Sequence, residues 1–187
     1  MLSGPHSITL CGTVAEEAHE QIQKVLEGGK RIQLSRMLLV DAKNHLDRRD
    51  FCHAVFDIAT ALEVHIEAFL SRHKPNKLEE GIYTQYDHVL KDITGKSLYD
   101  EPDLSFALEY IRNVRNNIAH EGQCKFTIKH LNRKSKHYDQ FLQMGEHRIH
   151  SPRQLNQMRE SAIAILDFAD RLEALTFPPK DTSGNDS

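Results

Sequence analysis

The sequence predicts an all-α fold, a helical bundle of about five to six helices, and three observations favour it. Apolar residues recur at helical spacing in several segments of this 187-residue chain. Glycine or proline stands between most of those segments, as is typical of connecting turns. An apolar fraction of 39% and a charged fraction of 27% belong to a globular protein that buries its own core.

Local signals set the expected ends of the helices. Asn76 and Glu79 have the spacing of a capping box, which predicts a helix from that point. Pro102 suits the first turn of a helix, and Gly122 stands where a C-terminal cap is expected. Together with the apolar periodicity, these signals predict helices over 13–27, 32–46, 51–72, 76–92, 102–121 and 151–175.

The last helix has the clearest start, because Ser151 and Gln154 form a capping box around a proline. Residues 123–150 before it are harder to assign, and we expect a short strand or hairpin with polar loop or a short helix. The domain organisation follows as an N-terminal tail over 1–13, a helical domain over 14–175 and a disordered C-terminal tail over 176–187.

Composition limits the possible partners and compartments. The net charge of −3 argues against a globally basic nucleic-acid-binding protein, so any such contact must be local. The chain contains three cysteines without CxxC spacing, which favours reduced thiols and a cytoplasmic location. No apolar run approaches the roughly 18 residues of a spanning helix, and we expect no membrane association.

The segment from Tyr110 to Gly122 has an unusual polar face. Arg112, Asn116 and His120 are successive neighbours at i, i+4 spacing, opposite an apolar stripe. Arg115 lies at the edge of that stripe, where its stem can pack while its guanidinium reaches outward. A solvated face is the alternative, but such a face usually carries Lys, Glu and Gln.

The same helix contains three asparagines, which are poor residues in a helix interior because their side chains compete for backbone hydrogen bonds. Each costs a few tenths of a kcal/mol relative to better helix formers. Something in the fold or the function should compensate for that cost. The asparagines are Asn113, Asn116 and Asn117.

The helix over 51–72 is apolar around more than half of its circumference and should be central. Glu63 lies within its apolar surface, and a buried carboxylate needs a partner. Arg112 and Arg115 are the natural partners. Two interpretations stay open: an ion pair that only fixes two helices, or a pair that orients the arginine towards phosphate. His65 is expected to be a satisfied core histidine.

The stretch RNNIAH, from Arg115 to His120, resembles the Arg-x4–6-His signature of HEPN domains, including the polar residue directly after the arginine. The long apolar helix with its acidic residue is similar to the central helix of that family. In helix order and loop placement the resemblance covers about residues 35–175. By this resemblance Arg115, Asn116 and His120 are the catalytic candidates, and Glu63 is a looser match. Arg112 is a supporting candidate through its expected pairing with Glu63.

The resemblance implies a small helical domain that usually dimerises. Active members are metal-independent endoribonucleases found as toxins of toxin–antitoxin pairs, in phage defence and in RNA-guided effectors. We therefore expect a homodimeric ribonuclease without cofactor or metal, which forms 2′,3′-cyclic phosphate ends and pairs with an antitoxin or effector protein. The alternative is a catalytically silent HEPN-like module for dimerisation or for binding a nucleotide or partner protein.

A basic segment follows the motif and is the expected RNA-binding surface. It contains no acidic residue between 125 and 137. Phe126 and Tyr138 are candidate groups for stacking on bases, although a solvated basic loop would have the same composition. The candidate phosphate contacts are Lys125, Lys129, Arg133, Lys134 and Lys136.

The sequence contains few other signals of catalytic or metal-binding chemistry. It contains no Gly-rich phosphate loop, no G-x-S-x-G and no HExxH motif. His147 and His150 lie three residues apart, with two further histidines nearby at 130 and 137, but we expect no metal site from them.

Overall fold

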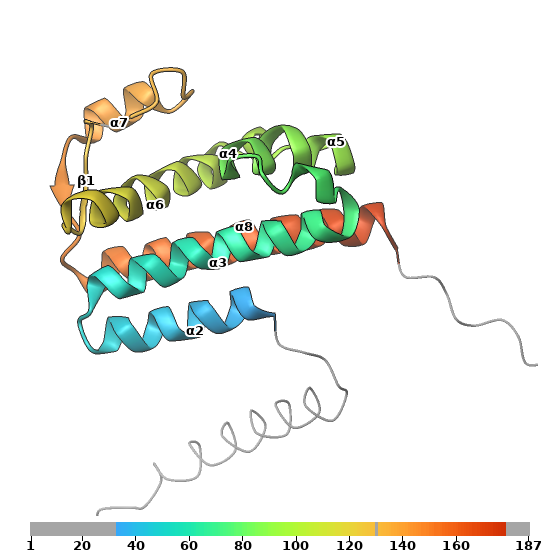
Figure 1. Cartoon of the computed structure of the whole chain (residues 1–187). Coiled ribbons are helices and arrows are strands. Elements are labelled where there is room, and N and C mark those ends of the chain that lie inside the picture. Colours follow the sequence, from blue (N-terminus) through green and yellow to red (C-terminus); the bar gives the residue numbers. More distant parts are fainter. Residues whose placement is uncertain (1–32, 130, 179–187) are drawn as a thin grey trace, which may run out of the picture. The chain divides into compact units, whose positions relative to one another are not determined.

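The computed structural model describes residues 33–129 and 131–178. They form a bundle of α-helices with one small antiparallel sheet, so the predicted all-α bundle is confirmed (Figure 1). The expected helix over 13–27 and the N-terminal tail lie outside the described residues, as does most of the C-terminal tail. The long helices are α2 (Leu34–Asp47), α3 (Phe51–His73), α6 (Pro102–Glu121) and α8 (Pro152–Thr176).

The segment between α3 and α6 differs from the expectation. Asn76 lies in a 3-10 turn that begins at Pro75, so it does not cap the next helix, which starts at Ile82 with Gly81 as N-cap. The predicted capping box at Asn76 and Glu79 is therefore wrong. The shorter elements are η1 (Pro75–Lys77), α4 (Ile82–Thr84), the π-helical turn η2 (Gln85–Val89), α5 (Leu90–Thr94) and η3 (Leu98–Asp100).

The other end signals are confirmed. Pro102 lies in the first turn of α6, and Gly122 ends that helix in the left-handed region with φ of 67°. At the start of α8, the Ser151 side chain accepts from the backbone of Gln154, whose own side chain bonds back to the cap. Each capping interaction of this kind stabilises a helix end by about 1 kcal/mol.

The core is built around α3, which packs against α2, α6 and α8. The side chains of Leu62, Ile66 and Leu70 on α3 are completely buried, and each contributes roughly 1.5–3 kcal/mol through burial. None of the helices in the described part of the chain has the length and apolar character that crossing a bilayer requires.

Residues 123–150 fold back onto α6. The expected strand is β1 (Lys125–Phe126), which pairs antiparallel with β2 (His147–Arg148), and α7 (Tyr138–Met144) lies between them in sequence. Phe126 is fully buried and stacks on Tyr110 and Phe141, each with 5.3 Å between ring centroids. The expectation that Phe126 stacks on bases is therefore wrong, because its ring fills the core under this segment.

The two cysteines among the described residues are free thiols. Cys52 and Cys124 are both half-buried, and burial with the neighbouring Cys52 raises the pKa of Cys124 to about 12. A thiol that stays protonated is a poor nucleophile and a poor metal ligand. Cys11 lies outside the described residues.

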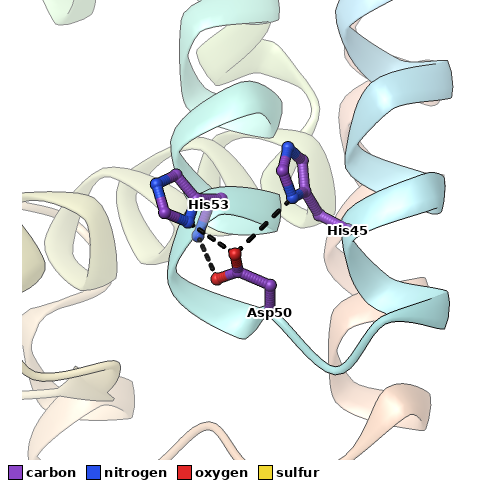
Figure 2. A group of neighbouring side chains, drawn as sticks. All are labelled: His45, Asp50 and His53. Atoms are coloured by element: carbon purple, nitrogen blue, oxygen red, sulfur yellow. Dashed lines mark hydrogen bonds and ion pairs between the residues drawn. The ribbon is translucent and has the colours of Figure 1, made fainter.

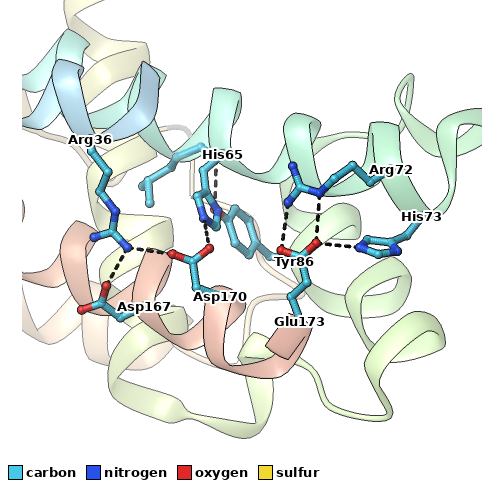
Figure 3. A network of polar contacts seen from close by, with 9 residues as sticks. Arg36, His65, Arg72, His73, Tyr86, Asp167, Asp170 and Glu173 are labelled. Carbon is cyan, nitrogen blue, oxygen red and sulfur yellow. Dashed lines mark hydrogen bonds and ion pairs between the residues drawn. The ribbon is translucent and has the colours of Figure 1, made fainter. Parts of the chain in front are cut away.

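A chain of ion pairs connects α2, α3 and α8 (Figure 3). Asp170 on α8 accepts from the buried Nε2 of His65 at 2.8 Å and from Arg36 on α2 at 2.8 Å. One turn further on, Glu173 accepts from Arg72 at 2.9 Å and from His73 at 2.7 Å. His65 is thus the core histidine that the sequence predicts, although its Nδ1 has no partner among the described residues.

This network predicts a specific loss of stability in acid. Burial alone would raise the pKa of Asp170, but hydrogen bonds from His65 and Arg36 outweigh it and hold that pKa below the usual 3.8. A lowered folded pKa stabilises the protein above the unfolded pKa, and this stabilisation disappears as the pH falls through the folded value. We expect Asp170→Asn to be less stable than wild type in urea at pH 6, with the difference shrinking below about pH 4.

The matched control for this measurement is Asp139→Asn, because Asp139 is an exposed aspartate on α7 without an ion pair among the described residues. Its urea midpoint should match wild type at pH 6 and at pH 3. A constant difference between Asp170→Asn and wild type over this range would contradict the role assigned to the carboxylate.

Candidate functional site

The apolar stripe of α6 faces the core as expected. Leu108, Ile111 and Val114 are completely buried where α6 packs on α3 and α8, and the polar side of the helix lies outside this apolar contact. On that polar side, Arg112, Arg115 and Asn116 are half-buried and His120 is exposed. The candidate residues therefore share one helix, but they differ in their access to solvent.

Glu63 on α3 lies between the two arginines of α6. Its carboxylate oxygens are 3.8 Å from an Nη of Arg112 and 3.7 Å from an Nη of Arg115. The pairing expected from the sequence is therefore present, but both distances exceed those of direct hydrogen bonds. The three side chains are 21 to 31% exposed, so solvent screens this attraction and it adds little to stability.

Both guanidiniums keep unused donors. The buried Nε atoms of Arg112 and Arg115 have no hydrogen-bond partner among the described residues. Arg115 does donate from Nη1 to the Oδ1 of Asn116 at 3.2 Å. Two guanidiniums against one carboxylate leave one net positive charge. The buried Nε atoms are out of reach of a ligand, but the exposed part of each guanidinium and the net charge suit a phosphate group.

Aromatic rings lie against both guanidiniums. Arg112 is 5.0 Å from the centroid of the Tyr83 ring, and Arg115 is 6.0 Å from the centroid of the Phe56 ring. Burial raises the pKa of Tyr83 to about 12, so its ring stays neutral near physiological pH. Contacts of this kind limit the orientations of a guanidinium and preorganise its flat face.

Two of the three asparagines have structural roles. Asn113 donates to the carbonyl of Thr127 at 2.8 Å and accepts from the amide of the same residue at 3.0 Å. Asn117 donates to the carbonyl of Gln123 at 2.8 Å. Both side chains bind the returning chain to α6, which compensates for their low helix propensity. Among the three, only Asn116 remains half-buried and is bonded to Arg115 alone.

His120 stands apart from these groups. It is exposed in the last turn of α6, and no hydrogen bond or ion pair connects it to any described residue. A cation near a helix C-terminus interacts favourably with the exposed carbonyls there. Within a single chain, the structure pairs Arg115 with Asn116 and Glu63 but leaves His120 without a partner.

The expected RNA-binding residues do not form one uniform surface. Glu121 lies 3.4 Å from Lys125 and 3.3 Å from Lys129, so one carboxylate offsets half of the charge of these two lysines. Lys136 donates to the carbonyl of Tyr99 and lies over its ring. The other two candidates, Arg133 and Lys134, are exposed and have no ion pair among the described residues.

The difference between paired and unpaired basic residues predicts unequal effects on RNA affinity. Each true phosphate contact contributes roughly one unit to the slope of log affinity against log salt concentration. We expect the double variant Arg133→Ala/Lys134→Ala to reduce that slope by about 1 to 2 units, measured by fluorescence anisotropy with a labelled single strand. Lys129→Ala should reduce it less, because Glu121 competes for that ammonium; equal effects would contradict this division.

A surface pocket of about 380 Å³ lies between η3 and the basic segment. Its lining mixes the carboxylates of Asp87 and Glu109 with Lys134 and Lys136. Glu109 is already bonded to Tyr99 at 3.1 Å and to Ser135 at 2.5 Å. Such a mixed lining does not favour an anion, so this pocket is not the phosphate site.

Two of the histidines after α6 bind the segment 123–150 to that helix. His137 is buried and its Nε2 is 2.8 Å from the Oγ of Ser105. The Nε2 of His147 is 2.8 Å from the hydroxyl of Tyr110. Residue 130 is not among the described residues. The spacing of these histidines could not reveal these roles, because their partners lie 32 and 37 residues away in the chain.

Comparisons with protein-family models, with curated proteins and with solved structures find no match to this chain.

Proposed function

We propose that this protein is a metal-independent endoribonuclease of the HEPN type, with its centre at Arg115, Asn116 and His120. The observation that carries the proposal is the pair of arginines around Glu63, which are partly exposed and together with that carboxylate carry a net positive charge. The resemblance of RNNIAH to the family signature supplies the reaction. It also supplies the two settings that we propose, a toxin–antitoxin pair or a phage-defence system.

The chemistry assigns a different task to each residue type. RNA provides its own nucleophile, the 2′-hydroxyl beside the scissile phosphate, and the products are a 2′,3′-cyclic phosphate and a 5′-hydroxyl. Arg115 stabilises the developing charge on the phosphate, and the Glu63 carboxylate limits where its guanidinium can move. His120 transfers a proton near neutral pH, and Asn116 orients Arg115 through their hydrogen bond.

One histidine acts as acid or base, but not as both in the same step. A two-fold dimer that brings two copies of α6 together would place a second His120 in one cleft. The exposure of His120 at the end of α6 leaves it free to meet the opposite copy. We therefore propose a homodimer whose cleft is formed by the polar faces of two α6 helices. Multi-angle light scattering at working concentration measures the mass of the assembly, and a monomeric mass would contradict the proposed homodimer.

The test of the reaction is cleavage of a mixed-sequence RNA by the full chain in EDTA. We expect cleavage, with 2′,3′-cyclic phosphate ends that resist ligation until they are removed. Cleavage that appears only after a divalent metal is added would overturn the metal-independent reaction. Arrest of bacterial growth on expression would support the toxin setting and indicate an antitoxin partner.

The second candidate is a catalytically silent HEPN-like module for dimerisation or nucleotide binding. One observation favours it: Glu121 pairs with Lys125 and Lys129 and so competes with RNA for both ammonium groups. A folded dimer that binds labelled nucleotide but leaves RNA intact in EDTA would select this candidate.

A further inference from the structure

Three potential ligand groups gather at the turn between α2 and α3 (Figure 2). His45 lies in the last turn of α2, Asp50 is the N-cap of α3, and His53 lies in the first turn of α3. One nitrogen or oxygen from each lies within 4.8 Å of the others. In the sequence this is His-x4-Asp-x2-His, which spans the end of one helix, a turn and the start of the next.

The two histidines converge on one carboxylate oxygen. The Oδ2 of Asp50 is 2.7 Å from the Nδ1 of His53 and 3.7 Å from the Nδ1 of His45. The two imidazole rings are stacked with 5.3 Å between centroids and 24° between their planes. Ligand atoms that share one tetrahedral zinc ion at about 2.0–2.2 Å lie roughly 3.3–3.5 Å apart. Small side-chain rotations would bring these three atoms to that spacing.

A fourth residue, Asp57, faces one of the proposed ligands on the side away from the metal. The other ring nitrogen of His45, Nε2, is 3.6 Å from the Oδ2 of Asp57 on α3. Histidines that bind metals usually donate their second N–H to a carboxylate, which fixes the tautomer and the ring orientation. Asp57 is therefore placed to hold His45 with its Nδ1 directed at the shared oxygen of Asp50.

The backbone of the turn also brings the groups together. Arg49 adopts φ of 60°, the left-handed region, and it is the one non-glycine residue with positive φ in the described part of the chain. This conformation costs an arginine about 1 kcal/mol. It reverses the chain between Asp47 and Phe51, so that the first turn of α3 lies beside the last turn of α2.

We propose that His45, Asp50 and His53 bind one divalent transition metal ion, with Zn²⁺ as the first candidate and Asp57 as a positioning residue. Two imidazoles and a carboxylate are a common ligand set for zinc, with water in the fourth position. His53 is 68% exposed, which leaves the site open to solvent. The ion would tie α2 to α3 across the turn. This replaces the sequence-based expectation of no metal site.

The proposed metal ligands are different residues from those of the proposed ribonuclease centre. Its three ligands belong to α2 and the start of α3, while Arg115 and His120 belong to α6. Failure of one proposal therefore leaves the other standing. Cleavage of RNA in EDTA by His53→Ala at the wild-type rate would separate the two sites experimentally.

The test is isothermal titration of Zn²⁺ into the untagged full chain, with metal content per chain measured after dialysis. We expect one ion per chain. The variants His53→Ala and Asp50→Asn should each weaken binding at least tenfold, and Asn at position 50 keeps a side chain that caps α3. Asp57→Ala should weaken it about tenfold, as expected for an outer partner of a ligand. Zn²⁺ at a hundredfold excess over Kd should raise the melting temperature by roughly 5–10 °C.

The matched control is His88→Ala. His88 is 77% exposed and lies 3.7 Å from Asp87, so it is another His–Asp pair on the same protein. The His88→Ala variant should bind Zn²⁺ with the affinity of the wild type. No ion per chain, or equal losses in His53→Ala and His88→Ala, would overturn the site. An unchanged affinity in Asp57→Ala would remove the positioning role of that residue.

Discussion

His120→Ala is expected to lower the rate of RNA cleavage by about 10²- to 10⁴-fold, the range that a positioned proton-transfer group contributes. Stability should hardly change, because His120 is exposed and has no bonded partner among the described residues. Exposed positions of this kind usually shift the free energy of unfolding by less than about 0.5 kcal/mol. The measurement is single-turnover cleavage of a labelled RNA in EDTA, next to a urea unfolding curve.

His88→Ala is again the matched control, since it removes another exposed histidine from the same chain. It should cleave as fast as wild type. Equal cleavage by His120→Ala and wild type would mean that the activity belongs to another site or to a contaminant. Loss of both activity and folded structure would contradict the exposed position of the side chain.

Phe126→Ala should destabilise the protein by about 3–5 kcal/mol, as large-to-small changes in a packed aromatic core do. Its ring is fully buried between Tyr110 and Phe141 and holds β1 against α6. We expect a lower urea midpoint and faster amide hydrogen exchange over residues 123–150. RNA affinity should fall only to the extent that residues 123–150 unfold.

Tyr138→Ala is the control for this change, because Tyr138 is half-buried and starts α7 in the same segment. Its cost should be about 1 kcal/mol or less. If Phe126→Ala kept wild-type stability and lost only RNA affinity, its ring would be a surface group after all.

The helix ends were predictable where a residue type has one main use at that position. Pro102 can start a helix but not continue one, and Gly122 takes the left-handed conformation that most residues avoid. Asn76 misled the prediction because its capping potential is equally compatible with the 3-10 turn that Pro75 begins. A local signal of that kind cannot indicate which of two nearby turns the chain adopts.

The remaining features depend on residues that are distant in the sequence. The pairing of β1 with β2 and the bonds of Asn113 to Thr127 require the chain to return across α6. The ion pair from Glu63 to the arginines followed from a single carboxylate within an otherwise apolar helix surface, so periodicity was enough to find it. The pair of Glu121 with Lys125 has i, i+4 spacing, so the sequence contained a local signal for this ion pair just before the basic segment.

The asparagines of α6 show how evolution would act on neighbouring positions for unrelated reasons. Asn113 makes two hydrogen bonds with the backbone of Thr127, as a neighbouring strand would. Selection for folding would preserve these bonds even in a relative without any activity. Asn116 bonds only to Arg115 among the described residues, so under the proposed function drift would remove it once that function was lost. An ancestry reconstructed from the whole stretch would therefore mix a record of folding with a record of the proposed activity.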